Sequence, residues 1–485
     1  MSVLPDYDLV ILGGGTAAFA AITEASGRGL STAMVNTGLP LGGTCVNVGC
    51  VPSKHLLAVG DQAATPQENP FKAVQYSDGE PTVDWEAALD GTDELVERFR
   101  QENYVDVAEH FETDIYEGYG QLVDDTTIEV VDGADEGARI TGEKALVATG
   151  SSPWAPPIDG LNDVYYYTSE TILEERNLPE SIVMLGGGYI ALEWGQILHR
   201  VGVDVTILQR SDRVLSGMEG QLGREMQRAF EDQGIEVITG NDFQRVRAPA
   251  GDGGAEAMQS GVAVETTVDG TEQTVTGDAL FVAAGVQPNS EGIGLETVGV
   301  ETNDDGTIHV DEQFQTTNPD VYAAGDVIGE PELETVAAKE GNHAVKNAFG
   351  NEGVSIDYSA VPAVVFTDPE VAAVGTTELE YMTEHGTCSC RTIQMADVPR
   401  AKAVKNIDGL VQVVKHHETD EIVGVHMVGP RAADMIMEAT LAVKFGLTVD
   451  GIIDTVHPFP TFSEAFKHAC QAFRRDTSTM SCCVE

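Results

Sequence analysis

The sequence has little positive charge and no long apolar run. Its 27 Lys and Arg residues face 79 Asp and Glu residues, which gives a formal net charge of −52. A nucleic-acid partner is not expected, because phosphate contacts need a basic face. A membrane-spanning helix is not expected either, because no run of about 18 apolar residues is present. The first residues lack a basic segment followed by an apolar core, so we expect a cytoplasmic protein without an export signal.

The surplus of acidic residues predicts a solvated surface rather than a disordered chain. Apolar residues make up 42% of the sequence, which is too many for disorder. A negative charge of this size repels itself at low salt, whereas 1 M salt shortens the Debye length to about 3 Å. We therefore expect a halophilic surface, and we assign the charge no part in catalysis.

The cysteines lack the pattern of a structural disulfide framework or of a zinc site. Their number is odd, their spacing is uneven, and no C-x-x-C pair is present. Closely spaced cysteines then favour redox chemistry or metal binding. We expect Cys470 to be a buried apolar residue of a helix. Cys388 and Cys390 form a C-x-C pair that could scavenge metal, but we expect them to be incidental surface or edge residues. The seven cysteines are Cys45, Cys50, Cys388, Cys390, Cys470, Cys482 and Cys483.

The chain contains the same β-α-β pattern twice. An apolar strand at residues 8–12 leads through glycines into a helical pattern at 16–28 and a second strand at 31–35. The pattern returns with strands at 181–185 and 204–208 on either side of a glycine loop and a helix. Such repetition predicts two dinucleotide-binding domains in tandem.

From about residue 355 the pattern changes to that of an α+β domain. Strand-like runs at 409–415 and 422–428 precede helical patterns at 432–445 and 464–473. Other predicted elements are an acidic helical stretch at 84–109, a flexible loop at 250–261 and a mobile tail at 476–485.

The first glycine loop has the G-x-G-x-x-A pattern of a pyrophosphate site. Gly13 and Gly15 allow a tight turn, and Ala18 completes the pattern on the helix. Backbone N–H groups at the helix start then face the negative charge of a pyrophosphate. The second strand of such a unit usually ends in an acid that binds a ribose hydroxyl. Asn36 stands there in this chain.

The second loop favours NADPH over NADH. Gly186 and Gly188 repeat the glycine pattern, but no acid ends the second strand. Gln209, Arg210 and Arg213 follow that strand instead. A carboxylate there would repel a 2′-phosphate, whereas a guanidinium pairs with it.

The most specific stretch is residues 42–54, G-G-T-C-V-N-V-G-C-V-P-S-K. At the start of a helix, the spacing of Cys45 and Cys50 places the two sulfurs about one turn apart on one face. A helix N-terminus lowers the pKa of a thiol and stabilises the thiolate. We therefore expect a redox-active pair in thiolate form.

This stretch resembles the active-site signature of the FAD-dependent pyridine nucleotide–disulfide oxidoreductases. Three further segments are similar to motifs of that family: 148–150 to the strand end where the chain leaves the FAD domain, 321–326 to the second FAD motif, and 460–464 to the dimer-interface motif. These ordered matches run along nearly the whole chain.

The resemblance implies roles for individual residues. Cys50 is expected to be the thiolate beside the flavin and Cys45 the outer, exchanging thiol. Lys54 is expected near the flavin, paired with Glu193, and Tyr189 is expected to gate the nicotinamide pocket. Further cofactor contacts are expected at Gly43, Thr44, Gly120, Thr149, Gly150, Ile190, Gly285 and Asp326, with Asp326 at the ribityl chain.

The implied fold class is α/β, with two Rossmann-like domains for FAD and NADPH and a C-terminal α+β dimerisation domain. The expected boundaries are an FAD domain at 1–152 and 278–352, an NAD(P)H domain at 153–277, a dimerisation domain at 353–475 and the tail at 476–485.

Two features bear on the substrate. The vicinal pair Cys482 and Cys483 suits a soft metal ion and resembles the tail of mercuric reductases, where it captures Hg(II) and passes it to the partner subunit. Related disulfide reductases carry a histidine before the Pro-Thr of segment 460–464, paired with a glutamate such as Glu464. Phe459 stands at this position in the present chain and cannot accept a proton. Mercuric reductases usually carry a tyrosine at the same position, so the chain also departs from their pattern.

The sequence therefore predicts a homodimeric, NADPH-dependent reductase that takes Hg(II) as a thiol complex to Hg(0). Two alternatives stay open. One is a thioredoxin-reductase-like or dihydrolipoyl-dehydrogenase-like disulfide reductase, whose tail acts as a second dithiol. The other is a component of a larger complex that has lost its catalysis.

Overall fold

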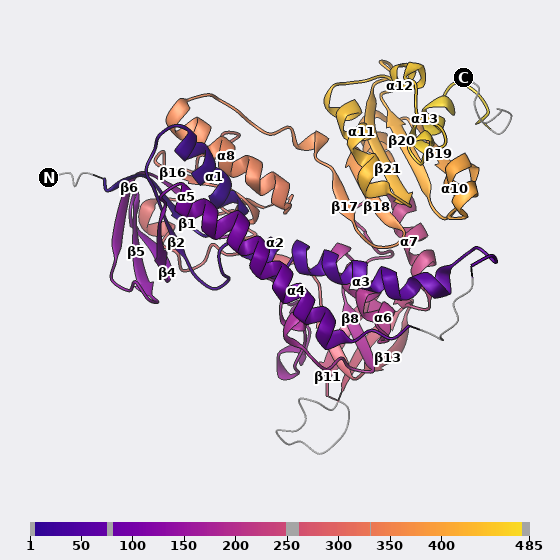
Figure 1. The fold of residues 1–485 in the computed structure, drawn as a ribbon, viewed down its shortest axis with the longest axis horizontal. Coiled ribbons are helices and arrows are strands. Elements are labelled where there is room, and N and C mark those ends of the chain that lie inside the picture. The colour runs from indigo at the N-terminus through magenta and orange to yellow at the C-terminus, as the bar shows by residue number, and fades with distance from the viewer. Residues whose placement is uncertain (1–4, 75–80, 249–260, 330, 478–485) are drawn as a thin grey trace. The chain divides into compact units, whose positions relative to one another are not determined.

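A computed structural model describes residues 5–74, 81–248, 261–329 and 331–477, which form two compact units (Figure 1). The units are interleaved along the chain. The first comprises Met1–His55, Glu86–Trp154 and Gly285–Ile356, and the second comprises Leu56–Trp85, Ala155–Ala284 and Asp357–Glu485. The four-part division expected from the sequence stays a prediction.

The first unit is built on a seven-stranded sheet. Its strand order is β3-β2-β1-β6-β5-β4, and β16 also pairs with β6. Strands β1, β2, β3, β6 and β16 pair in parallel, whereas β4 and β5 extend the sheet antiparallel. The strands are β1 (Tyr7–Leu12), β2 (Thr32–Asn36), β3 (Asp114–Glu117), β4 (Tyr119–Asp124), β5 (Thr127–Asp132), β6 (Arg139–Val147) and β16 (Val321–Ala323); β7 (Ser151–Pro153) and β15 (Val286–Pro288) form a separate pair.

Both faces of β1, an inner strand of this sheet, are buried, as is usual for parallel strands. Leu9 and Ile11 of β1 lie in a core cluster with residues of α1 (Thr16–Gly27) and α8 (Glu334–Gly350). Val10 and Leu12 point to the other face, where the core includes residues of β4 and β5. The apolar run at the start of the chain is therefore a strand with no solvated face.

The predicted acidic helical stretch is present and runs from Trp85 to His110. It consists of α4 (Trp85–Arg100), a π-helical turn (Gln101–Val105) and α5 (Asp106–His110).

The second unit contains the other Rossmann-like sheet, β10-β9-β8-β14, in which every pairing is parallel. The sheet comprises β8 (Ser181–Leu185), β9 (Asp204–Leu208), β10 (Glu236–Ile238) and β14 (Ala279–Val282), connected by α6 (Tyr189–Arg200) and α7 (Gly220–Gln233). A three-stranded antiparallel sheet follows α7 and β10, formed by β11 (Asp242–Arg247), β12 (Val262–Val268) and β13 (Thr271–Gly277).

The C-terminal part of the second unit is the predicted α+β domain. An antiparallel sheet in the order β17-β18-β21-β20-β19 shares a core with its helices. Its strands are β17 (Ala363–Val365), β18 (Glu370–Gly375), β19 (Cys390–Gln394), β20 (Leu410–Lys415) and β21 (Ile422–Gly429). Its helices are α9 (Glu378–His385), α10 (Pro399–Val404), α11 (Ala432–Lys444), α12 (Val449–Asp454) and α13 (Glu464–Gln471). The predicted fold class is thereby confirmed.

A guanidinium joins three parts of the second unit. The Arg200 side chain at the end of α6 is 3% exposed and forms ion pairs with Asp61, Glu68 and Asp368. Asp61 and Glu68 belong to α3 (Cys50–Glu68), and Asp368 precedes β18. A buried cation needs such partners, because the desolvation of an unpaired charge is costly.

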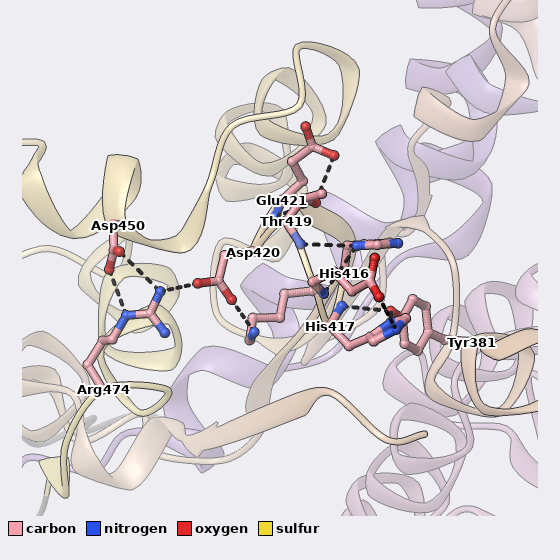
Figure 2. A network of polar contacts seen from close by, with 10 residues as sticks. Tyr381, His416, His417, Thr419, Asp420, Glu421, Asp450 and Arg474 are labelled. Atoms are coloured by element: carbon pink, nitrogen blue, oxygen red, sulfur yellow. Dashed lines mark hydrogen bonds and ion pairs between the residues drawn. The ribbon is translucent and has the colours of Figure 1, made fainter. Parts of the chain in front are cut away.

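A second guanidinium holds the last described turn of the chain (Figure 2). Arg474 donates to Asp450 at 2.7 Å and to Asp420 at 2.6 Å. The chain beyond α13 therefore leaves from a fixed point. The tail predicted at 476–485 lies outside the described residues from 478 onward, and so does nearly all of the loop predicted at 250–261.

None of the helices in the described ranges is long and apolar enough to cross a membrane.

We expect Gly341→Ala to destabilise the first unit. A Cβ at Gly341 of α8 would lie 2.1 Å from the carbonyl oxygen of Ala17 in α1, so the helices must separate. Such overpacking costs about 1–3 kcal/mol and would lower the urea midpoint for unfolding of the full-length protein.

The matched control is Gly27→Ala at the end of α1, where a Cβ meets nothing within 4 Å. Its midpoint is expected to stay unchanged or to rise slightly, since alanine favours helix. Equal midpoints for the two variants would show that α1 and α8 are not in close contact.

Candidate active site

The first glycine loop has no room for side chains on the strand side. Gly13 has φ +118°, and a Cβ there would lie 2.1 Å from the carbonyl oxygen of Ala148. At Gly15 the nearest atom to an added Cβ is the Cα of Gly43, at 3.9 Å, and no side chain caps the N-terminus of α1. The first N–H groups of this helix thus have both the space and the unused donors that a pyrophosphate requires.

Asn36 lies at the end of β2 beside this loop, as the sequence predicts. Its Oδ1 would be 2.6 Å from a Cβ on Gly14, and its Nδ2 donates to the carbonyl oxygen of Leu39 at 3.0 Å. The side chain is therefore fixed over the loop, and its contact with a ribose stays a prediction.

The second glycine loop repeats the first in its backbone geometry. Gly186 has φ +126°, and a Cβ there would lie 2.1 Å from the carbonyl oxygen of Ala283. A Cβ at Gly188 would meet nothing within 4 Å, and no side chain caps α6. Tyr189 and Ile190 begin α6, and the Tyr189 side chain is 42% exposed. This loop has the same capacity for a pyrophosphate.

The two arginines after β9 have different surroundings. Arg213 donates to the carbonyl oxygen of Ser216 at 2.9 Å and to Asp212 at 3.1 Å. Arg210 is exposed, and its backbone N–H donates to Gln209 Oε1 at 3.0 Å. Arg210 is therefore the more accessible cation for a 2′-phosphate.

The redox cysteines do not share one helix, which corrects the sequence prediction. Cys45 lies in α2 (Gly43–Asn47), whereas Cys50 is the first residue of α3. The helix breaks at Val48, where φ is −140°. A Cβ at Gly49 would lie 2.9 Å from the carbonyl oxygen of Thr44, so this crossing favours glycine. The two helices still bring the sulfurs together.

A carboxylate that the sequence did not predict completes this cluster. Ligand atoms of Cys45, Cys50 and Glu334 lie within 4.8 Å of one another, and the Cys45 thiol donates to Glu334 Oε2 at 2.5 Å. Thr16 donates to the other carboxylate oxygen at 3.3 Å. Glu334 begins α8, 289 positions from Cys45, so no motif spacing could have joined them.

The environment of Cys45 opposes the expected thiolate. A hydrogen bond with Cys50 raises the pKa of the Cys45 thiol well above its ordinary value, and burial and the Glu334 carboxylate raise it further. These two neighbours, Cys50 and Glu334, oppose the lowering of the thiol pKa that is expected at a helix N-terminus. Cys45 is therefore a protonated donor in this arrangement, with a carboxylate placed to receive its proton.

The other predicted FAD residues gather in the first unit. Thr149 donates to the carbonyl oxygen of Asn289 at 2.7 Å, and Gly150 has φ +69°. Asp326 follows β16 and accepts from the Ser151 hydroxyl at 2.7 Å. Gly43 and Thr44 begin α2, Lys54 lies in α3, Gly285 precedes β15, and Gly120 is buried in β4. Their cofactor contacts stay predictions.

Glu193 lies buried in α6, at 4% exposure, and accepts from the backbone N–H of Phe366 at 3.0 Å. It is thus a buried residue of the helix and not one of its surface residues. Its pairing with Lys54 stays a prediction.

The segment around Phe459 lacks the proton-transfer dyad of the disulfide reductases. Phe459 is 49% exposed, and Glu464 is buried at the start of α13, where it accepts from the Thr461 backbone N–H at 3.2 Å. Burial raises the pKa of Glu464 above its ordinary value. His457 is engaged elsewhere, with Glu438 at 2.8 Å and the carbonyl oxygen of Thr455 at 2.9 Å.

An exposed apolar row runs along α11. Met437, Leu441 and Phe445 follow one another at intervals of four and are 51%, 49% and 67% exposed. A contiguous apolar face of this kind marks an interaction surface. Cys470, by contrast, is fully buried, as the sequence predicted.

Comparison with known proteins identifies the family. Residues 7–341 match the pyridine nucleotide-disulphide oxidoreductase family, and residues 361–470 match its dimerisation domain. The chain therefore belongs to the pyridine nucleotide–disulphide oxidoreductases and carries their dimerisation domain. Membership in this family implies FAD and a pyridine nucleotide as cofactors.

Relatives within the family narrow the comparison. The chain is 40% identical to a mercuric reductase of Streptomyces lividans, over 99% of this chain and 98% of that protein. It is 38% identical to one of Staphylococcus aureus, over 99% and 84%, and 33% identical to a dihydrolipoyl dehydrogenase of Bacillus subtilis, over 96% and 98%. The fold matches that of an Escherichia coli flavoprotein disulfide reductase, with a TM-score of 0.83, 24% identity and coverage of 96% and 99%.

We expect Glu334→Gln to lower the pKa of the Cys45 thiol, because the carboxylate raises it by hydrogen bond and charge. An adjacent charge typically shifts the pKa of an ionisable group by about one unit or more. The pH profile for alkylation of Cys45 in the reduced protein, followed by peptide mapping, should move to lower pH.

Glu352→Gln is the matched control, since Glu352 pairs with Arg28 in the same unit. Its alkylation profile should coincide with that of the unmodified protein. A Glu334→Gln profile that does not move would mean that Glu334 does not hold the Cys45 proton.

Proposed function

We propose that the protein reduces Hg(II) to Hg(0) with electrons from NADPH. The observation that carries this proposal is Phe459 at the position where related disulfide reductases place a proton-accepting histidine. Reduction of an organic disulfide must return protons to the departing thiols, whereas reduction of a metal ion held between sulfurs needs no such base. The mercuric reductase relatives support the same substrate.

The chain's own residues have distinct parts in this proposal. Open N–H groups at the starts of α1 and α6 bind the two pyrophosphates, and Arg210 selects NADPH over NADH through its 2′-phosphate. FAD, when bound, would supply two-electron transfer from the nicotinamide to Hg(II) held by the two thiolates. Tyr189 covers the nicotinamide, and Cys45 and Cys50 hold Hg(II) as thiolates. The overall reaction is NADPH + Hg(II) → NADP⁺ + H⁺ + Hg(0).

Glu334 has the proton-handling part. Cys45 must lose its proton before its sulfur binds Hg(II), and the carboxylate oxygen 2.5 Å away is placed to receive it. The same carboxylate lies within reach of a cation held by both sulfurs. Glu334 thus receives the proton that Hg(II) displaces from Cys45, which is a different task from that of the histidine in the disulfide reductases.

The working form in this proposal is a homodimer. The apolar row on α11 and the family's dimerisation domain support it. Cys482 and Cys483, which lie outside the described residues, would take Hg(II) from its thiol complexes and pass it to Cys45 and Cys50 of the partner subunit. Arg474 fixes the point from which this tail departs.

A disulfide reductase is the second candidate. The carboxylate beside Cys45 favours it, because a thiol paired with a proton acceptor also suits thiol–disulfide exchange. The dihydrolipoyl dehydrogenase relative supports this alternative, at lower identity than the mercuric reductases quoted above.

We expect NADPH oxidation at high salt, in excess small thiol, to depend on Hg(II) and to release volatile mercury. Cys50→Ala should abolish both, because one of the two sulfur ligands is lost. Cys470→Ala, which removes a buried thiol of α13, is the control and should keep activity. Inhibition by Hg(II), together with consumption of a disulfide, would establish the second candidate instead.

We expect Phe459→His to create disulfide reductase activity. A histidine there with Glu464 restores an acid–base pair, which is worth about 10²–10⁴-fold in rate. Reduction of a small organic disulfide should rise at least at the lower end of that range, while Hg(II)-dependent oxidation of NADPH should not rise. Phe459→Tyr, a ring of similar size without the base, is the control. No gain with histidine would mean that Phe459 does not decide the substrate.

A further inference from the structure

Cys388 and Cys390, which the sequence suggested are incidental, meet a carboxylate in the C-terminal domain. The two sulfurs are 3.3 Å apart, and the Cys388 thiol donates to Glu378 Oε1 at 2.9 Å. Ligand atoms of all three residues lie within 4.8 Å of one another. Cys388 is exposed, whereas Glu378 and Cys390 are half-buried, so an ion can reach the cluster from solvent.

Regular structure places two of the three ligands. Cys390 is the first residue of β19 and pairs with Val414 of β20. Glu378 is the first residue of α9, whose start is fixed by a capping box between Thr377 and Glu380. The sulfur of Cys390 and the carboxylate of Glu378 are therefore positioned by a sheet and a capped helix, not by a loop alone.

The sheet also holds the carboxylate. Gln412 of β20 is fully buried and donates from Nε2 to Glu378 Oε2 at 3.1 Å. One oxygen faces the sulfurs while the other is fixed by an amide, as in metal sites whose outer partners orient the ligand.

The separation of the sulfurs selects among thiophilic ions. At a metal–sulfur distance of about 2.3 Å, tetrahedral geometry needs sulfurs about 3.8 Å apart, and linear geometry needs about 4.6 Å. The observed 3.3 Å between the two thiols is shorter than both values. A shift of about 0.5 Å reaches the tetrahedral separation, whereas linear geometry needs more than twice that movement. Two thiolates, one carboxylate and a water complete a tetrahedral set.

We propose that Glu378, Cys388 and Cys390 form a binding site for a tetrahedral divalent cation of the zinc type. Binding displaces the two thiol protons to solvent, and the cation takes two sulfurs, one carboxylate oxygen and a water. The site is separate from Cys45 and Cys50 and requires no redox step, so it stands apart from the proposed reduction of Hg(II).

The test uses the full-length, FAD-loaded protein in which Cys45, Cys50, Cys482 and Cys483 are replaced by serine. Co(II) is the probe, since its thiolate charge-transfer and tetrahedral ligand-field bands report both sulfur ligation and geometry in difference spectra. We expect one Co(II) per chain, displaced by Zn(II). Adding Cys388→Ser or Cys390→Ser should remove the charge-transfer band or shift it to a weaker, single-sulfur form.

Gln412→Met tests the support of the carboxylate and should weaken Co(II) binding by about 10–100-fold, the usual effect of losing an outer partner. Glu384→Gln, on the same helix but 73% exposed, is the matched control and should leave binding unchanged. FAD content and unfolding midpoint verify that each variant folds.

Three results would overturn the proposal. The first is no Co(II)–thiolate band in the serine background. The second is a band that survives both Cys388→Ser and Cys390→Ser together. The third is a Cys388–Cys390 disulfide that persists in excess thiol reductant, which would make the pair a redox element instead. Because Cys45 and Cys50 are absent from the tested protein, none of these results bears on reduction of Hg(II).

Discussion

The candidate active site depends on a close backbone contact between the first glycine loop and the start of α2, the helix that carries Cys45. The Gly42 N–H donates to the carbonyl oxygen of Gly14 at 2.8 Å, and a Cβ on Gly43 would lie 2.9 Å from the Cα of Gly15. Because the pyrophosphate loop and the start of α2 touch without side chains between them, the position of Cys45 is set by the loop. A residue larger than glycine at this contact would move the thiol away from the cofactor loop.

Much of the fold could be predicted because its strands carry strong local signals. The strands at 181–185 and 204–208 coincide with β8 and β9, and the strand predicted at 8–12 differs from β1 by one residue. Buried parallel strands read as continuous apolar runs, and glycines mark their ends. The same steric requirement, a glycine under a carbonyl oxygen, recurs at Gly13 and Gly186, which is why the repeated pattern was informative.

The site was less predictable, because its chemistry depends on contacts between distant segments. The spacing of Cys45 and Cys50 predicted proximity correctly, but not the helix break at Val48, which follows from the close crossing at Gly49. Glu334 carries no motif and lies 289 positions from Cys45. Its contact depends on how α1 packs on α8, since Thr16 of α1 holds the carboxylate from one side. Local patterns contain no information of that kind.

Proton transfer distinguishes the two candidate substrates, a metal ion and an organic disulfide. A thiol beside a carboxylate keeps its proton until something displaces it, and a soft cation does so by binding sulfur while the carboxylate receives the proton. Reduction of an organic disulfide differs, because the departing sulfur must gain a proton from a nearby acidic group. Related disulfide reductases carry a histidine before the proline at this position to move that proton, and Phe459 cannot do so. Phe459 therefore favours the proposed substrate, a metal ion, which takes electrons without taking a proton, whereas Glu334 suits either candidate.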